Sequence, residues 1–486
     1  MNYKMVLSML GKVLVIEAGL LLFPMLFGVI YAENNFNAFL FPILGLLAVG
    51  VPLSFLKSKD NSMYAKEGFV TVALSWILLS LTGAVPFVIS GEIPNYINAV
   101  FETVSGFTTT GASILSAAEI DGMSKALMFW RLFTHWIGGM GILVFVLAIV
   151  PTANAGAMHV FRTESPGPSV GKLVSKLSRT AKILYGIYFV MTVIQVVMLF
   201  CGGLPFYDSL LMSFSTAGTG GFGVSSSSAM NYSTYVQIVL AVFMFLFALN
   251  FNFYYLILIG SVRKAFLTEE VRTYFFIVLI ATVVVALNIF FAAGQMFSSF
   301  GDALKHSFFQ VSSISSTTGL VSANFNDWPE FSKSVLMLLT VIGACGGSTG
   351  GGIKIARVII LGKSTTFDLK RLIHPRAVVT TKFEGENLDK ETERNVKTYF
   401  VLWFVIVVVC VLLLTFDSYT NLFEDLSATL ACIGNVGPGF GVVGPAGSYA
   451  GYTAFSKVVL STAMLIGRLE IFPILLLFAP RTWKRG

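Results

Sequence analysis

The sequence predicts an all-α polytopic membrane protein in which four pseudo-repeated helix–loop–helix units follow an N-terminal two-helix extension. Three observations predict this fold. The 486 residues are 55% hydrophobic and only 12% charged, with a mean hydropathy of +0.80, which is too little charge to cover a soluble domain of this size. Long apolar stretches recur, most of them near the ~20 residues that cross a hydrocarbon core. Four glycine-containing motifs recur between them. The stretches are Val13–Tyr31, Phe39–Phe55, Phe69–Ile89, Leu127–Val150, Ile183–Cys201, Tyr235–Gly260, Tyr274–Ala293, Val335–Gly343, Tyr399–Thr415 and Val458–Pro480.

The extension, residues 1–57, holds two apolar stretches and no glycine motif. Lys4 and Lys12 precede the first stretch, as in a signal peptide. A second stretch follows at once without a convincing small-residue cleavage site, so we expect a retained helix.

The charges are distributed unevenly along the chain. If successive loops alternate across the membrane, all but six of the 32 Lys and Arg residues fall on the side of the two termini. In a multi-pass membrane protein this bias places both termini and the basic loops in the cytoplasm, and it argues against a nucleic-acid partner despite the net charge of +7. Acidic residues gather on the opposite side, where they form either a cation-attracting vestibule or ordinary solvated loops.

The four motifs each follow an apolar segment that is too short to span a bilayer. Segments of ~10–14 apolar residues indicate re-entrant or buried helices, and non-helical backbone at that depth survives only inside protein or beside water. Four such loops in one chain predict a single pore with pseudo-fourfold symmetry. The half-length segments are 98–108, 208–217, 303–315 and 424–433, and the equivalent glycines are Gly111, Gly221, Gly319 and Gly437, spaced by 110, 98 and 118 residues.

This pattern divides the chain into the extension, four pore repeats and one polar linker. The expected boundaries are 1–57 for the extension, 58–158, 159–262, 263–362 and 396–486 for the repeats, and 363–395 for a cytoplasmic linker.

The motif glycines suit the coordination of a dehydrated monovalent cation. A ring of backbone carbonyls can replace a hydration shell, and glycine tolerates the left-handed backbone that turns carbonyls inward. No carboxylate lies at any of the four glycines, which disfavours a divalent-cation ring. The oxygen set therefore favours K⁺ and similar ions. The Cys and His residues are scattered, without metal-ligand spacing or a disulfide pattern.

The motifs TTTGAS, STAGTGGFG, SSTTGL and GNVGPGFG resemble those of the Trk/Ktr/HKT potassium transporters. Together with the two-helix extension, the resemblance is closest to the bacterial TrkH membrane subunits and covers essentially the whole chain. It implies four nonidentical repeats around one ion path, a homodimer, and a filter simpler and wider than the TVGYG filter of potassium channels. It also implies a cytoplasmic TrkA/KtrA-type ring that binds nucleotides and contacts loops 159–182 and 363–397.

The resemblance maps the selectivity filter onto the four motifs. The expected filter residues are Thr109, Thr110, Gly111, Thr219, Gly220, Gly221, Thr317, Thr318, Gly319, Asn435, Val436 and Gly437. The expected K⁺ sites are at Thr110, Gly111, Gly220, Gly221, Thr318, Gly319, Val436 and Gly437.

A second set of anomalies lies 31 residues beyond each filter glycine, at Ile142, Asn252, Gly350 and Arg468. The third falls in a glycine run that cannot hold a stable helix and lacks the Lys-Ser/Thr of a phosphate-binding loop. It is either a flexible hinge or, as the resemblance implies, a gate below the filter. The expected gate residues are Gly346, Gly347, Ser348, Thr349, Gly350, Gly351, Gly352 and Arg468.

Arg468 lies inside an apolar run, where a charge costs about 2.5–3.5 kcal/mol unless it meets water or a partner. A pair with Glu470 is one alternative, although residues two apart point to different helix faces. A pore-facing Arg468 would repel a cation. Arg131 is either interfacial or an anchor of the pore helix. Glu102 and Asp208 are either vestibule charges or charges at half-helix N-termini that stabilise the helix dipole.

These observations predict a transporter, not an enzyme, that moves K⁺ and Rb⁺ without an organic cofactor. A K⁺ symporter coupled to H⁺ or Na⁺ is the alternative, although coupling needs a titratable group in the path. A receptor or scaffold is disfavoured because buried polar loops would then have no use.

Overall fold

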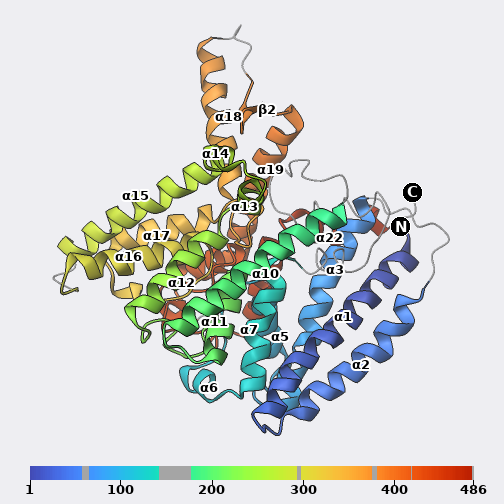
Figure 1. The fold of residues 1–486 in the computed structure, drawn as a ribbon. Helices are drawn as coiled ribbons and strands as arrows, with labels where there is room; N and C mark the ends of the chain where they lie inside the picture. Colours follow the sequence, from blue (N-terminus) through green and yellow to red (C-terminus); the bar gives the residue numbers. More distant parts are fainter. Residues whose placement is uncertain (57–64, 142–176, 293–296, 375–379, 418, 484–486) are drawn as a thin grey trace.

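The computed structural model describes residues 1–56, 65–141, 177–292, 297–374, 380–417 and 419–483 (Figure 1). The described part is almost wholly helical, which confirms the all-α prediction. Its strands are β1 (Lys382–Phe383) and β2 (Glu386–Asn387), which form one antiparallel hairpin.

Six described helices are long and apolar enough to cross a membrane, and a bent pair makes a possible seventh span. This confirms a multi-pass membrane protein. The spans are Tyr3–Ile30, Phe36–Ser54, Lys66–Ser90, Lys182–Cys201, Glu269–Phe291 and Lys390–Leu414, and the bent pair is Thr234–Phe247 with Phe251–Leu258.

The predicted extension is the helix pair α1 and α2, and α1 also packs on α3 and α7. The first two repeats follow. The bounds are α1 (Tyr3–Ile30), α2 (Phe36–Ser54), α3 (Ala65–Gly83), α4 (Val85–Ser90), α5 (Tyr96–Phe107), α6 (Ala117–Gly122), α7 (Lys125–Gly139), α10 (Leu177–Cys201), α11 (Phe206–Gly218), α12 (Thr234–Phe247), α13 (Phe251–Leu258) and α14 (Val262–Leu267).

The third and fourth repeats have the same order of a long helix, a short helix and a second, broken helix. Their bounds are α15 (Glu269–Ala292), α16 (Phe300–Ser315), η1 (Phe325–Asp327), α17 (Glu330–Ile342), α18 (Ile355–Ile373), α19 (Lys390–Leu414), α20 (Leu422–Ile433), η2 (Gly441–Val443), α21 (Ala454–Arg468), α22 (Phe472–Phe478) and α23 (Pro480–Trp483).

The four short helices α5, α11, α16 and α20 begin and end within three residues of the predicted half-length segments. Side chains cap three of them: Asn95 accepts two N–H groups at the start of α5, Ser299 caps α16, and Asn421 forms a capping box with Glu424 on α20. Such caps satisfy N–H groups that a helix start leaves without an intrahelical partner.

These pore helices form a closed ring. Each contacts the second helix of its own repeat and the second helix of the preceding repeat. The pairs are α5 with α7 and α21, α11 with α12 and α7, α16 with α17 and α12, and α20 with α21 and α17. Because the first repeat closes on the fourth, the four units surround one axis.

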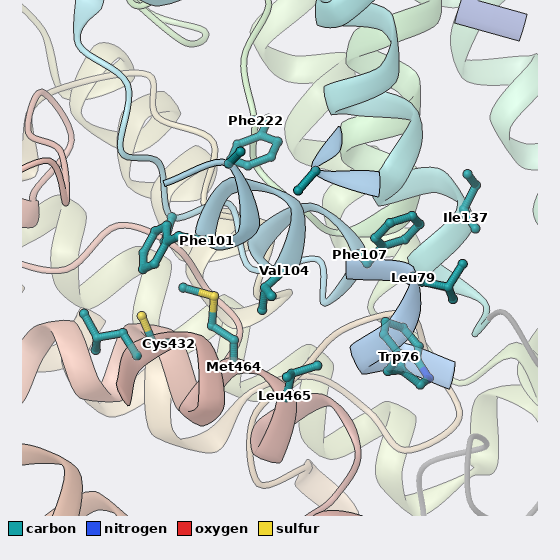
Figure 2. Close-up of a cluster of buried hydrophobic side chains, with 14 of the residues drawn as sticks. Trp76, Leu79, Phe101, Val104, Phe107, Ile137, Phe222, Cys432, Met464 and Leu465 are labelled. Carbon is teal, nitrogen blue, oxygen red and sulfur yellow. The ribbon is translucent and has the colours of Figure 1, made fainter. Parts of the chain in front are cut away.

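The packing around α5 joins residues from distant parts of the chain (Figure 2). Phe101, Val104 and Phe107 of α5 lie in one buried cluster with residues of the second and fourth repeats, including Phe222 and Met464. Because lipid is as apolar as these side chains, close packing, not transfer from water, stabilises this contact.

The second helix is broken in three repeats, and in the first it ends at Gly139. The α12–α13 pair bends by 88°, and residues 343–354 separate α17 from α18. The continuous apolar stretch predicted at Val458–Pro480 is wrong as a single helix. It breaks between α21 and α22, where Glu470 and Ile471 have φ of 56° and 70° and Pro473 lies in the first turn of α22, a place that proline tolerates.

Helix α18, the hairpin and the start of α19 project from one end of the molecule, toward which both chain ends also lie (Figure 1). Part of the predicted polar linker is therefore folded. Lys354, at the end of the segment that separates α17 from α18, and Arg357, in the first turn of α18, are only 3% and 9% exposed.

Candidate ion pathway

The four filter motifs share one unusual backbone conformation. In each, the residue two before the glycine and the glycine itself have positive φ. The non-glycine residues are Thr109 (54°), Thr219 (55°), Thr317 (62°) and Asn435 (53°), and the glycines are Gly111 (80°), Gly221 (87°), Gly319 (80°) and Gly437 (97°). Such backbone is rare outside glycine, so its recurrence at four equivalent positions identifies one structure made four times.

The residue between these two is hydrogen-bonded in the same way in every repeat. Its N–H donates to the carbonyl five residues earlier, at the end of the pore helix. The pairs are Thr110 to Ser105 (2.9 Å), Gly220 to Ser215 (2.8 Å), Thr318 to Ser313 (2.8 Å) and Val436 to Ala431 (2.8 Å). The helix end therefore fixes each filter strand.

The four strands meet around one line. A Cβ atom added to each filter glycine would collide with the carbonyl oxygen of the residue before the next filter glycine. The distances are 2.0 Å from Gly111 to Gly220, 2.0 Å from Gly221 to Thr318, 2.1 Å from Gly319 to Val436, and 2.5 Å from Gly437 to Thr110. The four carbonyls of Thr110, Gly220, Thr318 and Val436 thus form a ring, and only glycine fits between them.

All four filter glycines also line one cavity of about 300 Å³. Its wall includes Arg131, Phe222 and Tyr449. The cavity therefore reaches the four glycines that pack against the ring of carbonyls.

The fourth repeat differs from the others. The Tyr449 hydroxyl donates to the Gly437 carbonyl at 2.8 Å. The Gly437 carbonyl oxygen, at an expected K⁺ site, therefore already accepts one hydrogen bond from the protein. Asn435 replaces the threonine of the other motifs and donates to Thr110 Oγ1 at 3.0 Å. The side chain of the fourth motif thereby supports the first.

Arg131 and Glu102 form a buried ion pair beside the filter, with Nε and Oε1 2.7 Å apart. Glu102 also accepts the Ile114 N–H at 3.0 Å, and Arg131 donates to the Ser113 hydroxyl at 3.2 Å. Both residues therefore hold the segment after Gly111 in place. Glu102 is 1% exposed and lies in the middle of α5, which rules out the open alternatives of a vestibule charge and a helix-start charge.

The glycine-rich loop, residues 343–354, lies directly below the filter. The Gly351 N–H donates to Thr317 Oγ1 at 2.6 Å. A Cβ atom on Gly350 would lie 2.6 Å from the Ser316 carbonyl oxygen, and one on Gly351 would lie 2.4 Å from that of Gly434. The loop therefore contacts the base of the third and fourth motifs.

Three groups from other elements hold the far side of this loop. The Gly346 N–H donates to Oε1 of Glu270 at 2.6 Å, and the Phe251 N–H donates to the Gly347 carbonyl at 3.0 Å. The Cys345 N–H donates to the Ala248 carbonyl at 3.1 Å. The loop is thus anchored at the break between α12 and α13 and at the start of α15.

Arg468 reaches the same loop from the end of α21. Its Nη1 donates to the Thr349 carbonyl at 2.7 Å, and its Nη2 donates to the Gly138 and Gly139 carbonyls at the end of α7. The structure thus brings together the predicted gate residues of two repeats, while Ile142, the equivalent position in the first repeat, lies outside the described residues.

A family model described as TrkH, cation transport protein, matches residues 34–485. The chain belongs to the TrkH family. It is 32% identical over 490 residues to the Trk system potassium uptake protein TrkH of Salmonella typhimurium, with both chains covered completely. It is 29% identical over 465 residues to the TrkG protein of Escherichia coli K12, which covers 95% of this chain and 94% of the relative.

A solved structure, the potassium transporter TrkH from Vibrio parahaemolyticus, matches with a TM-score of 0.89 and 31% identity over the whole of both chains. The fold of this TrkH-family chain is therefore that of a known transporter, and the family consists of transporters, not enzymes.

Several polar residues of this TrkH-family pathway were missed by sequence reasoning. Glu470 forms its ion pair with Arg357, and not with Arg468, which was one of the alternatives for that arginine. The Lys354 ammonium donates to the Gly350 carbonyl. Glu270 opens an apolar span, where a charge usually marks an interface. The charge beside the glycine run at Lys354 was a signal that could have been used; Tyr449 and Glu270 carried none.

Proposed function

We propose that this chain translocates K⁺, and Rb⁺ in its place, across the bacterial inner membrane through the four-strand filter. The relatives are named potassium uptake proteins. The observation that carries the proposal is the ring of carbonyls from Thr110, Gly220, Thr318 and Val436, each packed against the glycine of the neighbouring repeat. Carbonyl rings of this kind replace the water around a monovalent cation.

The pore helices support a cation at this place. All four end at the filter, and the C-terminal end of a helix carries a partial negative charge. No carboxylate stands in the four motifs, so the attraction comes from dipoles, which suit an ion that must leave again.

The glycine-rich loop and Arg468 form the gate of this proposal. The loop lies against the base of the filter through Gly351 and Thr317, and the Arg468 guanidinium places a permanent positive charge beside it. Ions would pass when the loop withdraws and Arg468 releases Thr349.

Control from the cytoplasm has a direct route to this loop. Glu384, at the turn of the β1–β2 hairpin, accepts the N–H groups of Glu269 and Glu270 at 3.0 and 3.1 Å. Glu270 in turn holds Gly346 and the Asn250 side chain. In a homodimeric transporter, a TrkA/KtrA-type nucleotide-binding ring that contacts the hairpin would therefore act on the glycine-rich loop through Glu384 and Glu270.

A K⁺ symporter coupled to H⁺ is the second candidate. The buried Glu270 and Lys354 side chains contact the glycine-rich loop and supply titratable groups that the sequence pattern did not place there. Movement of a proton at these groups would couple to movement of the loop.

The test is ion flux into proteoliposomes with K⁺, Rb⁺, Na⁺ and Cs⁺, with and without a proton gradient. We expect K⁺ and Rb⁺ flux that follows the K⁺ gradient alone, and its loss in Gly319→Ala, whose Cβ would meet the Val436 carbonyl. Gly362→Ala, on α18 with open space around its Cβ position, is the matched control. Flux that requires the proton gradient would favour symport, and equal Na⁺ and K⁺ flux would refute a K⁺ filter.

A further inference from the structure

We propose that His135, on the second helix of repeat 1, is a positioning residue that sets ion selectivity by holding the filter strand of repeat 2. The inference rests on the proposed K⁺ translocation and assigns to it a determinant that lies outside the four motifs. Its observation is a buried imidazole that bridges two repeats directly behind the ring of carbonyls.

The hydrogen bonds of His135 define one neutral tautomer. The side chain is completely buried. Its Nδ1 lies 2.8 Å from the Gly106 carbonyl oxygen, which can only accept, so Nδ1 carries the hydrogen. The Phe222 N–H donates to Nε2 at 3.2 Å, so Nε2 carries a lone pair. One ring therefore connects the first pore helix to the second filter strand.

The imidazole also explains why the second motif departs from the others. A Cβ atom on Gly220 would lie 2.1 Å from Cγ of His135. Thr110, Thr318 and Val436 occupy the equivalent position in the other repeats. The His135 ring fills the space that a side chain takes there, and the carbonyl of Gly220 is the oxygen that repeat 2 gives to the ring.

Phe222 is held by two residues of the same helix face. Its ring centroid lies 4.3 Å from that of His135 and 3.6 Å from the Arg131 guanidinium carbon. Arg131 also donates to the Gly223 carbonyl at 3.3 Å. Arg131 and His135 are four residues apart and therefore neighbours on α7. Together they hold the strand just after Gly221. Figure 2 labels Phe222 in the buried cluster around α5.

The consequence concerns selectivity more than rate. Discrimination between K⁺ and Na⁺ depends on where the carbonyl dipoles stand and how freely they move. If the Phe222 N–H loses its acceptor, the Gly220 carbonyl gains freedom on one side of the ring, and a smaller ion is better accommodated.

Two amide variants separate the two hydrogen bonds. His135→Gln places an acceptor near Nε2 and keeps the bond from Phe222. His135→Asn keeps a donor near Nδ1 for the Gly106 carbonyl and loses the hydrogen bond from the Phe222 N–H. His135→Phe loses both. The measurement is the K⁺/Na⁺ flux ratio in proteoliposomes, determined together with total K⁺ flux and the K⁺ concentration at half-maximal rate.

We expect the ratio to fall roughly tenfold in the Asn and Phe variants, as for the loss of one hydrogen bond, and the Gln variant to retain most of it. His306→Gln, which replaces a half-buried histidine bonded to Ser322, should leave the ratio unchanged. Equal ratios in the Gln and Asn variants would overturn the inference, even if the Phe variant does not fold. A loss of total flux at an unchanged ratio, or an equal shift in His306→Gln, would also overturn it. A wild-type chain without K⁺ preference would instead refute the proposed function.

Discussion

Arg468 Nη1 donates a hydrogen bond to the Thr349 carbonyl at 2.7 Å, while Nη2 of the same side chain donates to the Gly139 carbonyl at 2.7 Å. One residue of the fourth repeat thereby ties the glycine-rich loop of the third repeat to the end of α7 in the first. The loop cannot move away from the end of α7 unless Arg468 releases either the Thr349 carbonyl or the α7 carbonyls.

Replacing Arg468 with Ala should raise K⁺ flux tenfold or more, because each hydrogen bond from a charged donor is worth about 1.5–3 kcal/mol. Arg468→Lys should give an intermediate flux, since an ammonium keeps the charge but lacks the forked donors that reach both carbonyls. Flux per reconstituted protein measures the effect. Unchanged or lower flux from a well-folded Ala variant contradicts the role of Arg468 in the gate.

Replacing Glu384 with Gln should also favour the open loop, by roughly fivefold, because a carboxylate at a helix start is worth up to about 1 kcal/mol. Its loss loosens the start of α15 and, with it, the Glu270 contact to Gly346. Single-channel open probability or flux is the readout. Glu386→Gln, on the same hairpin and exposed, is the control, and an equal effect in both variants would show that the hairpin acts nonspecifically.

Breaking the Arg131–Glu102 pair should destabilise the protein strongly. A buried charge that loses its partner costs about 3–5 kcal/mol, so Arg131→Gln and Glu102→Gln should each lower the Tm in detergent by several degrees or prevent folding. The double variant, which leaves no unpaired charge, should recover part of the loss. A double variant less stable than the sum of both single effects would mean that the pair does not act as a unit.

Acid should weaken the contact between α6 and the loop that follows the second glycine motif. The Ser226 N–H and hydroxyl donate to the Asp121 carboxylate at 2.8 and 2.7 Å, and these bonds hold the pKa of Asp121 below its ordinary value. A lowered pKa in the folded state stabilises the protein above the ordinary pKa of about 3.9, and this stability is lost as the pH falls through the lowered value. Tm measured between pH 3 and pH 7 should therefore fall less steeply for Asp121→Asn. Parallel curves would exclude this contribution.

The sequence was sufficient to locate the half-length helices and the filter glycines. Both depend on local chemistry: an apolar run of restricted length, and a glycine where the backbone has a positive φ. The constant spacing of 31 residues from the filter glycines then placed the glycine-rich loop and Arg468 at one level, and the resemblance implied that they form a gate.

The remaining contacts could not be predicted because they join residues that are distant in the sequence. Glu270 and Gly346 are 76 residues apart, and His135 and Phe222 are 87 apart. Neither His135 nor Tyr449 lies in a motif, and the hydropathy of the 458–480 stretch gave no sign of the backbone turn at Glu470 and Ile471. Local patterns report local conformation, whereas these supports depend on how the repeats meet.

The circular contact between neighbouring filter strands has a consequence for how this pathway can evolve. In a channel assembled from four identical subunits, every mutation changes all four filter strands at once. Here a single polypeptide supplies each quarter separately, with an imidazole behind one strand and a phenol behind another. A single substitution can therefore change the ion preference by altering one of the four filter strands and leaving the other three as they are.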